Sequence, residues 1–149
     1  GGGGDPAGSG GWWGRVGGGG GGGAAEGRLA GLTSEIIGGA MEVHRSLGPG
    51  LLESAYESCL AWELAERGLQ VARQVPVPVH YKGVRMDCAY RLDLVINDAV
   101  VLELKTVSAL APIHTAQLLT YLRLTNLPVG LLLNFNSPTM KAGIKRISL

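Results

Sequence analysis

The periodicity of this chain changes at Gly68, and that change limits the folds it can adopt. Before Gly68, apolar residues recur at helical spacing in two segments, residues 34–47 and residues 51–68. After it, apolar and polar residues alternate through "QVPVPVHYKGVRMDCAYRLDLVI", which is typical of strands with one buried face. The chain therefore combines leading helices with a sheet.

The order of the remaining elements points to a mixed sheet. Two strands are expected around a turn at Lys82-Gly83, and Pro76 and Pro78 place the first on an edge or at a bulge, because proline cannot donate a ladder hydrogen bond. A third strand, "VVLELK", a helix at about residues 113–125 and an apolar strand, "VGLLLNF", follow. A leading helix and then the order α-β-β-β-α-β predict an α/β fold, with a mixed four-stranded sheet flanked by helices.

The N-terminal segment has a different composition. Most of the 25 glycines lie in residues 1–31, where apolar side chains are too few to offset the entropy cost of ordering the chain. We therefore expect a disordered glycine-rich tail at residues 1–31 and one domain at residues 32–149. Neither a signal peptide nor an apolar run long enough to span a bilayer occurs in the sequence, which favours a cytoplasmic protein with no membrane contact. The net charge of +1 neither favours nor excludes a polyanionic partner.

The register between the second and third strands decides which residues lie opposite the carboxylates of Asp93 and Glu103. A two-residue loop at Asn97-Asp98 would place each carboxylate opposite a leucine. A three-residue loop, residues 97–99, pairs Asp93 with Glu103 and gives every apolar residue an apolar partner. Those apolar pairs are Leu92 with Leu104, Leu94 with Leu102, and Ile96 with Val100. We therefore predict the three-residue loop or an equivalent bulge, with Asp93, Glu103 and Lys105 on one face of the sheet.

This charge cluster predicts a metal site. Two carboxylates at cross-strand distance repel each other, and a divalent cation removes the repulsion. Two hard oxygen ligands suit Mg²⁺, or Mn²⁺ in its place, because such an ion keeps water molecules that phosphate oxygens displace. Lys105 would then orient or deprotonate an attacking water, or stabilise developing negative charge.

Several segments together resemble a known family. "LGPGLLESAYE", "YRLDLVI", "VLELK", "HTAQLLTYLRL" and "GLLLNF" are similar to the bacterial GxxExxY family of the PD-(D/E)XK nuclease superfamily, with Gly50, Glu53 and Tyr56 at the positions of that name. The similarity runs from about Glu35 to the C-terminus. It implies a restriction-endonuclease-like fold with the core order α-β-β-β-α-β.

The resemblance also implies a site and an activity. The metal ligands would be Asp93, Glu103 and the Leu104 carbonyl. The catalytic residues would be Lys105, Glu53, Gln117 and Tyr121. The implied activity is Mg²⁺-dependent hydrolysis of DNA phosphodiester bonds.

Other interpretations stay open at this point. Glu53 could instead stabilise its helix N-terminus, Tyr121 could be a core aromatic, and Glu103 with Lys105 could form an exposed ion pair. The rival function is a catalytically silent module of the same fold that binds nucleic acid or a protein partner. RNA or a small phosphate ester are alternative substrates. Sequence-specific cleavage by so small a domain would require a homodimer or another partner.

Overall fold

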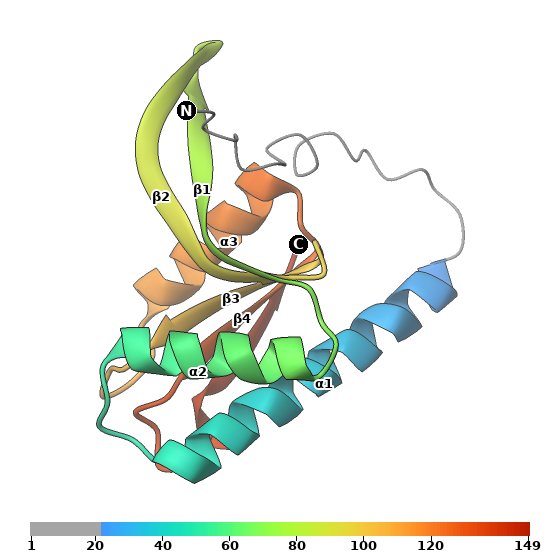
Figure 1. Ribbon diagram of the computed structural model, residues 1–149. Helices are drawn as coiled ribbons and strands as arrows, with labels where there is room; N and C mark the ends of the chain where they lie inside the picture. The colour runs from blue at the N-terminus through green and yellow to red at the C-terminus, as the bar shows by residue number, and fades with distance from the viewer. Residues whose placement is uncertain (1–21) are drawn as a thin grey trace, which may run out of the picture.

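The computed structural model describes residues 22–149, which form three α-helices, a short 3₁₀ helix and one five-stranded mixed sheet. The elements are α1 (Gly22–Leu47), α2 (Glu53–Glu66), β1 (Val71–Tyr81), β2 (Val84–Ile96), β3 (Val100–Lys105), α3 (Pro112–Thr125), β4 (Val129–Asn134), η1 (Lys141–Gly143) and β5 (Ile144–Ser148). The strand order is β1-β2-β3-β4-β5; β3 and β4 are parallel, and the other neighbours are antiparallel. The predicted α/β fold with a restriction-endonuclease-like core is confirmed (Figure 1).

The two faces of the sheet are covered by different helices (Figure 1). α1 and α2 pack on one face, where their buried side chains meet alternate residues of β2, β3 and β4. This core includes Ile36, Tyr56, Leu60, Leu94, Leu102, Leu131 and Phe135. α3 covers the other face through Leu118 and Leu122, which pack in a core with Val101 and Leu132. Burying both faces explains why β3 and β4 have near-continuous apolar sequences.

The sheet has one strand more than the four predicted. β5, with the sequence "IKRIS", pairs antiparallel with β4. Its apolar residues do not alternate, and Lys145 and Arg146 at its centre are exposed. An edge strand of this kind is specified by hydrogen bonds to its neighbour, so it leaves little pattern in its own sequence.

α1 begins earlier than predicted. It starts at Gly22, so residues 22–31, which were expected to belong to a disordered tail, are helical. Ala24, Ala25 and Leu29 favour this helix, and Leu29 packs at the margin of the core under α1. The remainder of the predicted tail, residues 1–21, lies outside the described residues.

β1 and β2 form a long hairpin that bends away from the rest of the sheet (Figure 1). The predicted turn at Lys82-Gly83 is confirmed, and both residues have positive φ. The proline prediction is also confirmed, because β1 is an edge strand and its register shifts around Pro78. The bend occurs at Gln74, whose φ of 50° is left-handed. We call the part beyond it, residues 75–91, the arm.

The predicted three-residue loop between β2 and β3 is confirmed. Leu94 pairs with Leu102, and Ile96 pairs with Val100, which leaves residues 97–99 as the loop. The predicted pairing of Leu92 with Leu104 is wrong, because Leu92 lies in the core under α3 and Leu104 in the core under α1 and α2. The bend of the hairpin at Gln74 turns this part of β2 to the opposite face. The paired ladder therefore stops at Leu94.

No helix among residues 22–149 combines the length and the apolar character required to cross a bilayer.

Candidate active site

The candidate site lies where β2 separates from β3. Beyond the last ladder pair, side chains take over as hydrogen-bond acceptors: the Asp93 N–H donates to Glu103 Oε1 at 3.2 Å, and the Leu104 N–H donates to Asp93 Oδ2 at 2.8 Å. Each carboxylate thus satisfies a backbone N–H of the opposite strand. The predicted proximity of Asp93 and Glu103 is realised through these reciprocal bonds, and not through backbone pairing.

Burial gives the two carboxyl groups unusual electrostatics. Glu103 is only 7% exposed; desolvation, and then the charge of Asp93, raise its pKa to about 8. The pKa of Asp93 is also raised, chiefly by burial, although the hydrogen bond from Leu104 opposes the rise. Without a bound metal ion, the pair therefore resists carrying two negative charges at neutral pH.

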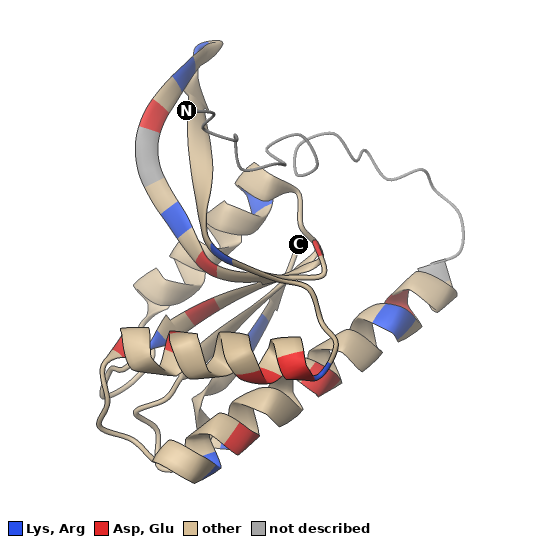
Figure 2. Ribbon diagram, viewed as in Figure 1, with Lys and Arg blue, Asp and Glu red and all other residues tan. Residues whose placement is uncertain are grey.

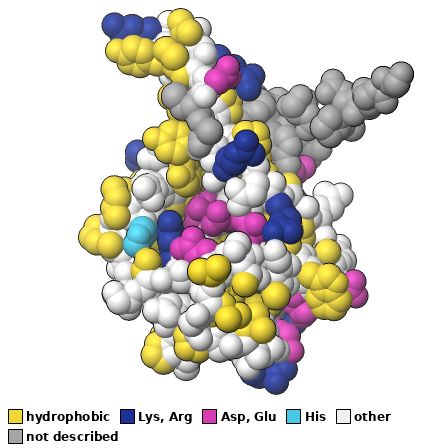
Figure 3. Space-filling view, turned by 60° about the vertical axis from the view of Figure 1, so that its left-hand side comes forward, with side chains coloured by type: hydrophobic (Ala, Val, Ile, Leu, Met, Phe, Trp, Pro, Cys, Tyr) yellow, Lys and Arg dark blue, Asp and Glu magenta, His cyan; other side chains and the backbone are white. Residues whose placement is uncertain are grey.

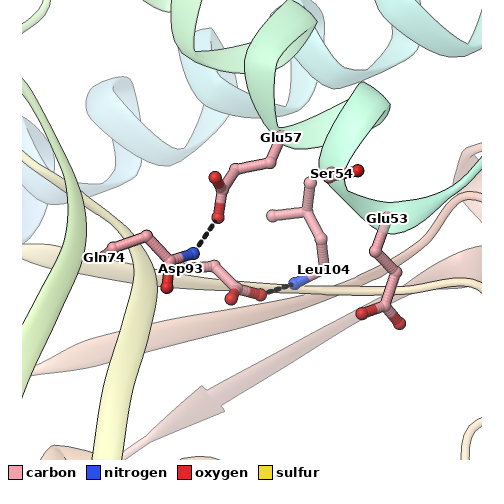
Figure 4. Close-up of a pocket in the computed structure, with 6 residues that line it drawn as sticks. All are labelled: Glu53, Ser54, Glu57, Gln74, Asp93 and Leu104. Atoms are coloured by element: carbon pink, nitrogen blue, oxygen red, sulfur yellow. Dashed lines mark hydrogen bonds between the residues drawn. The ribbon is translucent and has the colours of Figure 1, made fainter.

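Glu53 reaches this gap from α2. Its Oε1 accepts a hydrogen bond from the Thr106 N–H at 3.2 Å, which connects the start of α2 to the residue that follows β3. Glu53 and Asp93 line the same cavity of about 300 Å³, together with Leu104 (Figure 4). The structure thus brings the predicted Glu53 to the carboxylate pair.

Tyr56 sets the position of Glu53. Its hydroxyl donates to the Gly48 carbonyl and accepts the Leu51 N–H at 3.1 Å, and its buried ring stacks on Phe135 with centroids 4.6 Å apart. These contacts hold the loop before α2, in which Gly50 has a φ of 107° that side-chain-bearing residues rarely adopt. Gly50 and Tyr56 of the sequence motif therefore fix the loop before α2, and this fixes the position of Glu53 at the start of the helix.

Glu57 is a site residue that sequence reasoning missed. It lies one turn after Glu53 on α2, is 8% exposed, and accepts hydrogen bonds from Arg73 and from Gln74 at the bend of β1. Figure 4 shows Glu57 and Gln74 lining the cavity beside Asp93. The available signal was its spacing of four residues from Glu53, which places both side chains on one helix face.

Lys105 is the last residue of β3. By alternation its side chain leaves the strand on the same face as that of Glu103, and its charge lowers the pKa of Glu103 against the larger effect of burial. The Lys105 carbonyl accepts the Phe135 N–H at 2.9 Å, which holds this end of β3 against the chain that leaves β4. The predicted lysine is thus placed beside the predicted acid.

Gln117 and Tyr121 come from α3, on the opposite face from α2. Burial and then the charge of Glu103 raise the pKa of Tyr121, which places its hydroxyl within the field of the carboxylate pair. Gln117 is exposed and lies one turn before Tyr121 along the same groove. Tyr121 is thus brought to the site, and Gln117 lies at its margin.

His44 has a structural environment. Its Nε2 lies 2.8 Å from the Ser137 carbonyl oxygen, and its side chain is buried. This contact ties α1 to the segment after β4.

The donor set suits a hard divalent cation with few protein ligands. Among the side chains that the structure describes, no group of three or more His, Cys, Asp or Glu residues is arranged to share a metal. Two carboxylates are nevertheless a sufficient protein contribution for Mg²⁺, which keeps several water ligands. Asp93 and Glu103 each have one oxygen that takes no backbone hydrogen bond from the described residues, so the pair fits such an ion.

Comparison with known proteins identifies the class. A model of the PD-(D/E)XK nuclease superfamily matches residues 30–147, a range that contains the whole candidate site. The chain therefore belongs to the PD-(D/E)XK nuclease superfamily. A search of curated proteins and a search of solved structures each found no match.

Proposed function

We propose that this protein is a Mg²⁺-dependent nuclease that hydrolyses DNA phosphodiester bonds. One observation carries the proposal: Asp93 and Glu103 are held together in the gap between β2 and β3 by reciprocal hydrogen bonds, with Lys105 two residues further along β3. A buried carboxylate pair of this kind is costly without a cation, and a divalent ion bound between the two groups would offset that cost.

The metal ligands we propose are Asp93, Glu103 and the Leu104 carbonyl. The two carboxylates would hold Mg²⁺ or Mn²⁺, and the bound ion would supply charge neutralisation at the scissile phosphate and a more acidic water. Hydrogen bonds from the backbone already orient one oxygen of each carboxylate, so little reorganisation is needed on binding.

The chain's own side chains have separate roles in this proposal. Lys105 orients or deprotonates the attacking water, or stabilises the negative charge that develops on the phosphate. Glu53 reaches the gap from α2 and positions water or phosphate there. Gln117 and Tyr121 contact the substrate from α3. We further propose that the chain is a GxxExxY protein, a proposal supported by the Tyr56 contacts that present Glu53.

A cleavage assay tests this function. Single-stranded, duplex and branched DNA are incubated with the full chain in Mg²⁺, in Mn²⁺ and in chelator, and products are resolved on denaturing gels. We expect metal-dependent cleavage that Lys105→Ala reduces by at least about a hundredfold, within the range for loss of a proton-transfer group. Lys141→Ala, which changes an exposed lysine on η1, is the matched control and should cleave like the parent.

Two results would contradict the proposal. Equal activity of Lys105→Ala and Lys141→Ala would remove Lys105 from the site. An absence of metal-dependent cleavage of any DNA would favour the rival, a catalytically silent module with this fold. Parallel reactions with RNA and with a small phosphodiester decide between DNA and the alternative substrates.

A further inference from the structure

The arm, residues 75–91, rises beside the candidate site. Figure 3 shows acidic side chains gathered at the centre of this face, and the protruding hairpin with its basic and apolar side chains above them. Between the arm and α3 lies a groove of about 380 Å³, lined by Val79 and Tyr90 from the arm and by Gln117, Thr120 and Tyr121 from α3. The groove thus joins the arm to the residues of α3 that the proposed nuclease uses.

Aromatic side chains of the arm are unusually exposed. Tyr90 is 49% exposed at the groove, and Tyr81 is 59% exposed beside the hairpin turn. The Tyr90 ring lies 5.9 Å from the Tyr121 ring at an angle of 54°, so one edge is supported while much of the ring stays accessible. Exposed rings in a basic setting are the surfaces on which unpaired nucleic acid bases stack.

The arm also carries a local excess of positive charge. Residues 75–91 contain three basic residues, Lys82, Arg85 and Arg91, and one acidic residue, Asp87. Figure 2 shows basic positions along β2 and at the tip of the hairpin. Lys82, at the hairpin turn, forms no ion pair with any carboxylate among the described residues, and its Nζ lies 5.4 Å from the centre of the exposed Tyr81 ring, so its charge is available to a phosphate. Arg91 follows Tyr90 in β2, so alternation places its side chain on the face opposite the groove. The site itself is acidic, and a polyanion needs such a basic surface to approach it.

The groove leads to the reacting centre. Tyr90 contacts Tyr121 of α3, and α3 covers the face of β3 on which alternation places Glu103 together with Val101. A strand with one base against Tyr90 would therefore continue past Tyr121 towards the gap between β2 and β3. A duplex hides its base faces within its own stack, so it cannot use a side groove of this size.

We propose that the groove between the arm and α3 binds an unpaired base of single-stranded DNA, stacked on Tyr90, while Lys82 holds the backbone. This inference rests on the proposed function and narrows its substrate to single strands. The arm then serves as the substrate-binding element of the molecule.

Binding of a fluorescein-labelled 20-nucleotide single strand, followed by anisotropy, tests the inference. The full chain carries Lys105→Ala in Mg²⁺, so that the strand stays intact. We expect Tyr90→Ala to weaken binding about fivefold or more, the value for loss of one stacked base, and Tyr90→Phe to restore it. Trp62→Ala, which removes an aromatic that is 64% exposed on α2, is the matched control and should leave binding unchanged.

A second measurement does not depend on Tyr90. For single strands, each phosphate contact contributes about 0.7 to the slope of log binding constant against log salt. Lys82→Gln should therefore lower that slope by about 0.7, whereas Lys141→Gln should not change it. Thermal unfolding of each variant confirms that the fold is intact.

The outcomes separate this inference from the proposed function. Equal binding by Tyr90→Ala and Trp62→Ala, an unchanged salt slope, or a duplex bound as tightly as the single strand would overturn the inference, even if the parent cleaves DNA. Tyr90-dependent binding of single strands by a parent that cleaves no DNA would support the inference and defeat the nuclease proposal.

Discussion

At the scale of single residues, two carboxylates form hydrogen bonds with the backbone of the opposite strand. Asp93 and Glu103 accept hydrogen bonds that a continuing β-ladder would have given to carbonyl oxygens. The N–H groups are thereby satisfied, but two acidic groups are buried together. Burial and mutual repulsion make the protonation state of this pair sensitive to whether a cation is present.

The pKa of Glu103 predicts how stability depends on pH. In the folded protein this pKa is raised from 4.5 to about 8, by burial and then by the charge of Asp93. Between these values the unfolded chain has released a proton that the folded protein retains, so the free energy of unfolding falls as pH rises. In chelator we expect a fall of a few kcal/mol between pH 4.5 and about 8.

Urea denaturation across this pH range measures the effect. Glu103→Gln should remove most of the fall, and Mg²⁺ at the upper pH should raise the stability of the parent by binding the ionised pair. Glu66→Gln, at an exposed position near the end of α2, should leave the profile unchanged. A parent profile that is flat, or the same in Glu103→Gln, would show that Glu103 ionises normally.

At the scale of elements, close packing of α3 on β4 positions Gln117 and Tyr121. A Cβ added at Gly130 of β4 would lie 2.7 Å from Cδ1 of Leu118 and 2.9 Å from its Cγ, so the whole side chain is in the way. Leu118 is fully buried between α3 and the sheet and has little room to move. Glycine at this position therefore sets the distance between the helix and the strand.

Gly130→Ala should destabilise the protein. We expect a loss of about 1–3 kcal/mol in the free energy of unfolding, because the added methyl group overpacks the core under α3. Gly31→Ala is the matched control: no atom lies near its added Cβ on α1, so it should stabilise the helix by about 0.5–1 kcal/mol. Urea denaturation of both variants measures the difference, and a neutral Gly130→Ala would mean that α3 shifts freely.

At the scale of the whole molecule, the domain extends towards the N-terminus beyond the boundary that composition indicates. α1 starts at Gly22, and its Leu29 packs at the margin of the core. The family match starts at residue 30, within this helix. Among the described residues, every core residue lies at or after Leu29.

Two truncations test this boundary. A chain of residues 22–149 should unfold at the same temperature as the full chain, since both cores are intact. A chain of residues 32–149 should lose about 1 kcal/mol of stability, because it lacks the half-buried Leu29. Differential scanning calorimetry compares the three chains. Equal stability of the two truncated chains would place the domain boundary at residue 32.

Local pattern alone determined much of this protein. Helical spacing and alternation predicted the order of the elements up to β4, the turn at Lys82-Gly83 and the edge position of β1. The apolar residues of β2 and β3 also specified the odd loop, because a slip of one residue would have moved leucines out of the core. Such features depend on neighbours close in sequence, so the sequence is enough to predict them.

Contacts between distant segments decided the rest. β5 exists because β4 offers it hydrogen bonds, although its own residues do not alternate. Glu57 became part of the site because it bonds Gln74 across 17 positions, at the bend that turns Leu92 to the other face and opens the gap at Asp93. Alternation along β2 and β3 was enough to predict that Asp93 and Glu103 would be neighbours. The separation of their strands could not be predicted in this way, because it depends on a backbone bend held by a helix from elsewhere in the chain.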